Sequence, residues 1–159
     1  MTDGLIDKIK SRGYWRINYL PLEEVPALSV SACRAVVSKN TVELRGWDFP
    51  HIPMNDATGG ITPMDGFCEA WDEWGFHKEM WRMYSTGQFL CYMALREDWF
   101  DDDDRRRFLS GEIPPMSVLC INGSAIYQIT EFFEFLSRLV KDGLYKYADT
   151  SHDKYNHRY

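Results

Sequence analysis

Alternating apolar and polar positions predict a strand near the start of the chain. From Tyr14 to Leu20, the large apolar residues Trp15, Ile17 and Tyr19 fall on one side of an extended backbone and polar residues fall on the other. A period of two residues is typical of a half-buried strand. We therefore expect this segment to lie in a sheet with one face against the core.

The next segment has helical spacing. Val30, Cys33 and Val37 recur at intervals that place them on one side of a helix. Ser29 is a suitable N-cap, because a serine oxygen accepts a hydrogen bond from a free backbone N–H in the first turn. Asn40 is expected to end this helix in the left-handed conformation.

A short strand and a long loop are predicted next. Thr41–Arg45 alternates, with Val42 and Leu44 facing inward and Arg45 facing outward. Residues 51–65 are rich in proline and glycine and hold few apolar residues, so we expect a loop there.

Three further strands form a predicted antiparallel meander. They cover residues 66–74, 76–84 and 88–96, and glycine-containing breaks at Gly75 and at residues 85–87 separate them. The last of these segments is apolar on both of its faces. A strand of that kind is expected in the middle of a sheet that is covered on both sides.

The remaining pattern predicts two helices with a short strand between them. The segments are residues 97–111, 117–121 and 124–142. In the last helix one apolar stripe is expected to face the core, and it consists of Ile126, Ile129, Phe133, Leu136 and Val140, widened by Phe132 and Leu139.

Together these segments predict an α+β fold. We expect a single domain with a mostly antiparallel sheet of about five to six strands and two main helices packed on it. Its predicted limits are residues 13–143, with a lead-in at residues 1–12 and a polar C-terminal tail at residues 144–159.

Composition narrows the function classes. The 159 residues include 15% aromatic residues and carry a net charge of −6. An acidic chain disfavours nucleic-acid binding and anionic membrane surfaces, which require a basic footprint. No apolar run approaches the ~20 residues of a membrane span.

The four cysteines have no metal-ligand or redox spacing, so we expect free buried thiols in a cytoplasmic protein. No phosphate-binding or dinucleotide-binding glycine motif occurs, and no cofactor is expected.

The densest group of unlike side chains lies at residues 45–51, with the sequence RGWDFPH. One interpretation makes His51 a general base, Asp48 the group that orients it and Arg45 a clamp for an anion. The other makes Arg45 and Asp48 an ion pair that fixes a corner, with Trp47 and Phe49 filling the core. The structural interpretation is favoured, because no nucleophile or substrate-binding loop accompanies the group.

The meander adds acids, a histidine and tryptophans. Glu69 or Trp71 is expected to lie opposite Glu79 or Trp81 across the hairpin at Gly75. With Asp72, Glu73 and His77, such carboxylates suggest metal-assisted hydrolysis of a phosphodiester. The usual nuclease order of an acid followed by Glu-x-Lys is absent, and cross-strand charge pairs covered by tryptophans are the simpler interpretation. No resident metal is expected.

The motifs resemble those of a family of uncharacterised bacterial proteins. The resemblance rests on residues 13–15 (GYW), on residues 45–51, on E-x-W-R-x-Y-x-x-G-Q-F at residues 79–89 and on T-E-x-x-E-F at residues 130–135, and it spans roughly residues 12–142. It implies no catalytic residue. It suggests an accessory or sensing role.

These observations favour a binding or interaction module over an enzyme. The expected partner is a protein or a second copy of the chain, with a small ligand as a further option, bound through an aromatic and arginine surface. The candidate residues are Arg45, Trp47, Asp48, His51, Trp71, Glu79, Trp81 and Arg82. The alternative is a metal-assisted, nuclease-like hydrolase that uses His51, Asp48 and the meander carboxylates.

Overall fold

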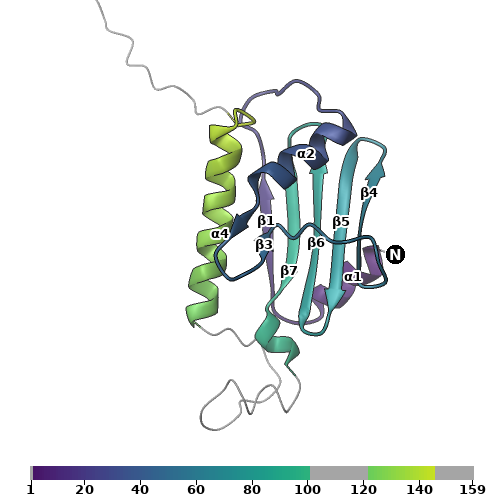
Figure 1. Cartoon of the computed structure of the whole chain (residues 1–159), viewed down its shortest axis with the longest axis vertical. Coiled ribbons are helices and arrows are strands. Elements are labelled where there is room, and N and C mark those ends of the chain that lie inside the picture. Colours follow the sequence, from purple (N-terminus) through teal and green to yellow (C-terminus); the bar gives the residue numbers. More distant parts are fainter. Residues whose placement is uncertain (1, 101–121, 146–159) are drawn as a thin grey trace, which may run out of the picture.

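A five-stranded antiparallel sheet with helices on both faces forms the body of the molecule (Figure 1). The computed structural model describes residues 2–100 and 122–145, and the strand order is β1-β7-β6-β5-β4. The elements are α1 Thr2–Lys10, β1 Tyr14–Tyr19, α2 Val30–Asn40, β2 Val42–Glu43, β3 Asp48–Phe49, β4 Gly59–Met64, β5 Phe67–Trp74, β6 His77–Tyr84, β7 Phe89–Ala94, a 3-10 helix at Arg96–Trp99, and α4 Asn122–Lys141. The α+β architecture predicted from the sequence is confirmed, with β2 and β3 forming a separate two-stranded sheet.

The predicted meander is present as strands β5, β6 and β7. Gly75 turns the first hairpin with a φ of 49°, a value that favours glycine. The resulting register places Asp72 opposite Glu79 and Ala70 opposite Trp81. Strand β7 lies between β1 and β6, so the prediction of a central strand is confirmed.

Strand β1 completes the sheet by pairing with β7, far away in the sequence. Ile17 lies opposite Cys91, and both side chains are buried. Trp15 and Tyr19 pack against the same core, as their alternation predicted. The N-terminal strand and the end of the meander therefore share one hydrophobic face.

The loop predicted at residues 51–65 is partly wrong, because its second half forms the edge strand β4. This strand pairs with β5 alone, and an edge position tolerates Pro63, which lacks a backbone N–H. β4 begins at Gly59, where its backbone lies close to neighbouring residues of the same chain. A Cβ at this position would be 2.8 Å from Asp72 Oδ1. The proline and glycine residues of β4 interrupt the alternation of apolar and polar positions, so the sequence pattern did not predict this strand.

Two of the helices cover opposite faces of the sheet (Figure 1). Helix α1 buries Leu5, Ile6 and Ile9 against Met80 and Tyr92, so the segment expected as a lead-in is packed on the sheet.

Helix α2 lies on the other face, where it contacts β4, β5 and β6. Ser29 Oγ caps it by accepting a hydrogen bond from Ala32 N at 3.1 Å, as predicted. Asn40 does not adopt the expected left-handed conformation. It remains helical, and its side chain donates to Val36 O at 2.9 Å.

Helix α4 occurs where the sequence predicted it, but it is rotated. Phe132, Phe135 and Leu139 are buried, together with the polar side chains of Gln128 and Glu131. The expected core residues Ile126, Ile129 and Phe133 are 65%, 40% and 68% exposed. The predicted inward stripe is therefore wrong for these three residues.

Some predictions differ at the ends of elements or lie outside the described residues. The strand expected at Thr41–Arg45 is shorter, because Leu44 is exposed and Arg45 turns inward to Glu131. The helix predicted at residues 97–111 begins as the 3-10 helix, and its remainder lies outside the described residues, as does the strand at residues 117–121. Within the described ranges, no helix is long and apolar enough to cross a membrane.

Candidate functional site

A corner after β3 places His51 over the meander. His51 Nδ1 lies 2.7 Å from Asp48 Oδ1, and the second carboxylate oxygen of Asp48 accepts a hydrogen bond from Ile52 N at 3.0 Å. Trp81 Nε1 donates to the carbonyl of His51 at 2.7 Å. The three-residue spacing of Asp48 and His51 thus forms an oriented acid–histidine pair.

Two carboxylates from the facing strands β5 and β6 converge on this pair. Asp72 Oδ2 lies 3.2 Å from His51 Nε2, and Glu79 Oε1 accepts a hydrogen bond from His51 N at 3.0 Å. Both carboxylates are buried and lie opposite each other in the strand register. His51 and the meander acids therefore share one site, which the sequence left open.

His77 forms the inner end of the group. Its Nε2 atom is buried without a hydrogen-bond partner, at 3.7 Å from Glu79 Oε2 and 3.9 Å from Asp72 Oδ2. Trp74 and Trp47 pack on the ring, with centroids 5.4 Å and 6.1 Å away. We call Asp48, His51, Asp72, His77 and Glu79 the acid–histidine cluster.

Burial and neighbouring charges move the pKa values within the cluster in different directions. Burial raises the pKa of Glu79 to about 7 and also raises that of Asp72. Burial lowers the pKa of His77 to about 3, which leaves this ring neutral at pH 7. The hydrogen bond to Asp48 raises the pKa of His51. Glu79 therefore titrates near neutral pH, unlike an ordinary carboxyl group.

Access to solvent is limited to one side of the cluster. The side chains of Asp48 and His51 are 30% and 27% exposed, whereas those of Asp72 and Glu79 are 5% and 3% exposed. Among the described residues, no group of three or more histidine, cysteine or acidic side chains is arranged to hold a metal ion. The accessible side of the cluster is therefore formed by the Asp48–His51 pair, with Asp72 and Glu79 buried beneath it.

Arg45 is engaged inside the protein. Its Nε donates to the two carboxylate oxygens of Glu131 at 3.0 and 2.9 Å, and its guanidinium lies 5.4 Å from the ring of Trp47. Glu131 is fully buried on α4, so the pair fixes the position of the helix over β3. The predicted Arg45–Asp48 ion pair is therefore wrong, because Arg45 pairs with Glu131 and Asp48 pairs with His51.

The predicted pairing across the first hairpin is wrong. Trp71 lies opposite Met80 and packs with the residues under α1, while Glu69 lies opposite Arg82 and forms an ion pair with it. Glu79 and Trp81 face the other side, toward His51. The register pairs each odd-numbered residue of β5 with an even-numbered residue of β6, so Glu69 and Trp71 face the opposite side of the sheet from Glu79 and Trp81. Trp71 and Arg82 therefore do not join the acid–histidine cluster.

A second candidate site is a row of apolar residues on α4, which the sequence pattern predicted to face the core. We call Ile126, Ile129, Phe133, Leu136 and Val140 the α4 seam. Its first three residues are exposed, whereas Leu136 and Val140 are half-buried and pack against the core. The spacing of three, four, three and four residues is the pattern by which helices recognise other helices.

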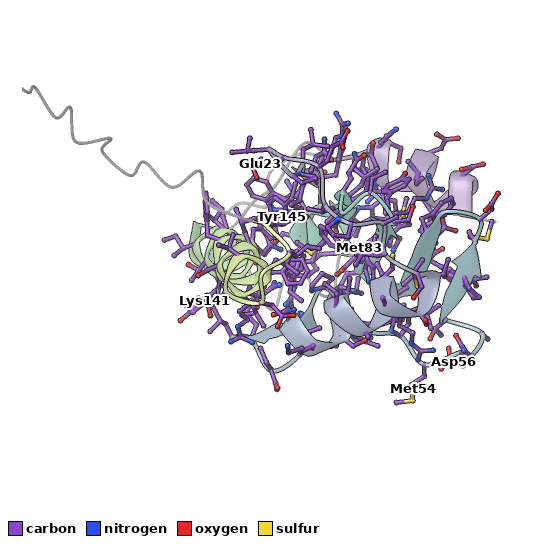
Figure 2. All side chains as sticks on the ribbon, turned by 90° about the horizontal axis from the view of Figure 1, so that it is seen from above. Glu23, Met54, Asp56, Met83, Lys141 and Tyr145 are labelled. Carbon is purple, nitrogen blue, oxygen red and sulfur yellow. The ribbon has the colours of Figure 1, made fainter. Side chains whose placement is uncertain are left out.

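Contacts on the other side of α4 explain why the seam faces outward. Arg45 holds Glu131, and Arg138 Nη1 donates to the carbonyl of Thr41. Trp15 Nε1 donates to Gln128 Oε1 at 2.7 Å beneath the helix. At 100° per residue, the seam lies roughly opposite Glu131 and Arg138 around the helix axis. In Figure 2, α4, which carries Lys141, stands at one side of the molecule, while Met83 lies toward its middle.

No protein-family model, no curated protein and no solved structure matches the chain. The resemblance to a bacterial family therefore stays a prediction.

Proposed function

We propose that the protein is a non-enzymatic interaction module that binds a protein partner through the α4 seam. The observation that supports this is the exposure of Ile126, Ile129 and Phe133 in one line on a well-anchored helix. Isolated exposed apolar residues are ordinary, whereas a contiguous row of large ones marks an interaction surface.

Burial of this row would release a substantial free energy. Transfer of a fully exposed leucine, isoleucine or phenylalanine side chain out of water stabilises a complex by about 1.5–3 kcal/mol. Phe133 is the most exposed residue of the seam and lies at its centre, where an anchor side chain contributes most. We therefore expect Phe133 to dominate the affinity for the partner.

A cytoplasmic location is part of the proposal. Cys33, Cys68 and Cys91 are free and buried, as expected where thiols stay reduced. Burial also raises the pKa of each of these thiols, so they stay protonated and unreactive at neutral pH.

The test is photo-crosslinking in cells at two positions of the same helix. A photoreactive phenylalanine analogue replaces Phe133 in one variant and Tyr127 in the other. Tyr127 is also exposed on α4 but points away from the seam. We expect a discrete adduct to another chain, identified by mass spectrometry, at position 133 only. Equal adducts at both positions, or an adduct only within the same chain, would contradict the proposal.

A second candidate is an acid–base enzyme, and the convergence of Asp48, His51 and Glu79 favours it. This is the hydrolase alternative without an assigned metal. His51→Ala would then abolish hydrolysis of a phosphodiester or nucleotide while the fold, followed by circular dichroism, is retained. Wild-type protein that leaves a broad panel of such substrates unchanged, with and without added divalent ions, would rule this candidate out.

A further inference from the structure

We propose that the edge of the sheet at β1 carries a binding surface for single-stranded nucleic acid, formed by Lys10, Arg12, Tyr14 and Arg16. We call these four residues the β1 strip. The strip lies on the side of the sheet against which α1 packs, whereas α4 packs against the other side. It therefore stands apart from the α4 seam, and the proposal does not depend on the proposed function.

Alternation along β1 directs two side chains of the strip to the open side of the sheet. Trp15, Ile17 and Tyr19 take the positions that face the core, so Tyr14 and Arg16 take the opposite ones. Both of these side chains are exposed. Helix α1 packs mainly on β6 and β7, and β1 is the edge strand beyond them (Figure 1). The strip is therefore open to a partner along this edge.

Aromatic rings hold the cations of the strip in position. Lys10 Nζ lies 4.9 Å from the centre of the Tyr92 ring, and Arg16 Cζ lies 6.0 Å from it. Arg12 Cζ lies 4.3 Å from the ring of Trp99. A contact of this kind orients a cation through the electrons of the ring and leaves its charge in place. The three cations thus remain available to an anion.

Carboxylates of the described residues do not neutralise the three cations, none of which forms an ion pair. Asp7 lies one turn before Lys10 on α1 and makes no ion pair with it. Arg12 Nη1 donates to the backbone carbonyl of Asp98 at 2.7 Å, while the carboxylate of Asp98 accepts a hydrogen bond from Gly13 N at 2.8 Å. The strip is therefore a local positive site in a chain whose net charge of −6 argued against nucleic acid.

The exposed ring between the cations determines which kind of anion fits. Tyr14 precedes Arg16 by two residues, about 7 Å along the strand, and its ring lies 6.1 Å from that of Tyr92. A base can stack on such a ring while the neighbouring phosphates contact the cations, as in other proteins that bind single strands. A duplex keeps its bases stacked inside, and an acidic side chain offers no flat ring to place on Tyr14.

The cations are spread along the chain instead of converging on one point. Lys10 ends α1, Arg12 lies in the turn that follows, and Arg16 belongs to β1. A row of this kind suits a polyanion that follows it, whereas a single phosphate would require convergent donors. With three phosphate contacts we expect sequence-independent binding, with a dissociation constant of about 10–100 μM.

Fluorescence anisotropy of a labelled oligouridine of about 12 nucleotides, titrated with the full chain, tests the proposal. Between about 0.05 and 0.2 M salt, binding to the wild type should weaken about 15-fold, because three phosphate contacts give a log–log slope of about −2. Arg16→Glu should weaken binding about tenfold. Arg34→Glu, the same charge change on an exposed side chain of α2, should bind like the wild type. Circular dichroism of each variant verifies that it is folded.

Two results of this titration would overturn the proposal. One is a wild type that does not bind at about 0.05 M salt with protein up to about 500 μM, well above the expected dissociation constant. The other is an Arg16→Glu variant that binds as tightly as Arg34→Glu.

Replacement of Tyr14 tests whether a base stacks on the strip. Tyr14→Ala should lower the affinity about 5- to 100-fold, the range expected when a ring that stacks one base is removed, whereas Tyr14→Phe should retain it. An abasic strand with the same number of phosphates should bind the wild type as weakly as the oligouridine binds Tyr14→Ala. Equal binding of the abasic strand and the oligouridine would show a surface for polyanions in general, and it would overturn the assignment to nucleic acid.

Discussion

Glu79 is the residue whose chemistry depends most on its surroundings. It is buried in the sheet, accepts a hydrogen bond from His51 N and faces Asp72 across the hairpin. Burial disfavours its ionised form, which raises its pKa to about 7. This carboxyl group therefore holds its proton over a pH range in which an exposed glutamate has lost it.

Glu79→Gln should make the protein less sensitive to rising pH. Because the folded-state pKa lies above the ordinary value of 4.5, the folded state binds the proton more tightly, and this contribution is lost as the pH rises through about 7. Relative to the wild type, the variant should gain up to about 3 kcal/mol in free energy of unfolding between pH 5 and pH 8. Urea unfolding at several pH values measures the difference. Glu24→Gln, on an exposed side chain, is the control, and a pH-independent difference for Glu79→Gln would contradict the prediction.

The Arg45–Glu131 pair should show strong coupling. Glu131→Gln leaves a guanidinium only 12% exposed without its carboxylate, and we expect a loss of about 3 kcal/mol in unfolding free energy. Arg45→Met combined with Glu131→Leu should cost less than the sum of the single changes, because neither charge is then left unpaired. A double-mutant cycle in urea measures the coupling energy. Additive effects would show that the pair does not fix α4.

At the scale of single residues, spacing along the sequence predicted contacts only between residues that are close together in the chain. Asp48 and His51 lie three residues apart and form the pair that the less favoured interpretation assigned, whereas the favoured Arg45–Asp48 pair is wrong. Asp72 and His77 join them through the strand register, which a single sequence does not specify. The buried partner of Arg45 lies 86 residues away on α4 and had no local signal.

Among the elements, α4 shows why helical periodicity alone did not identify the buried face. The helix has two apolar faces, one containing Phe135 and Leu139 and the other containing Phe133 and Ile126. Both faces repeat large apolar residues at helical spacing. The buried face is the one that also carries Gln128 and Glu131, which accept hydrogen bonds from Trp15 and Arg45.

The meander was predicted well because its turns carry a strong signal. Gly75 and Gly87 both adopt positive φ values, which is the role that their positions between apolar runs indicated. Strand β4 was missed because it has no alternating pattern and is defined by its pairing with β5.

Gly87→Ala should destabilise the protein more than Gly66→Ala. Both residues have positive φ, at 84° and 77°, so both variants incur the same backbone strain. At position 87 the added Cβ would also lie 2.7 Å from Val25 Cγ2, whereas at position 66 the nearest atom is 3.9 Å away. We expect about 1–3 kcal/mol of additional loss at position 87. Thermal unfolding of the two variants gives the comparison, and equal losses would refute the close contact.

The pairing of β1 with β7 has a consequence for synthesis on the ribosome. About 70 residues separate the two strands, which corresponds to several seconds at about 5–20 residues per second. During this interval β1 has no strand to pair with, and Trp15 and Tyr19 stay in water. Slow codons placed between residues 20 and 88 should therefore lower the yield of soluble protein, while the same codons placed after residue 94 should leave it unchanged. β1 is therefore translated before the other strands of the sheet but can pair only after β7 has been translated.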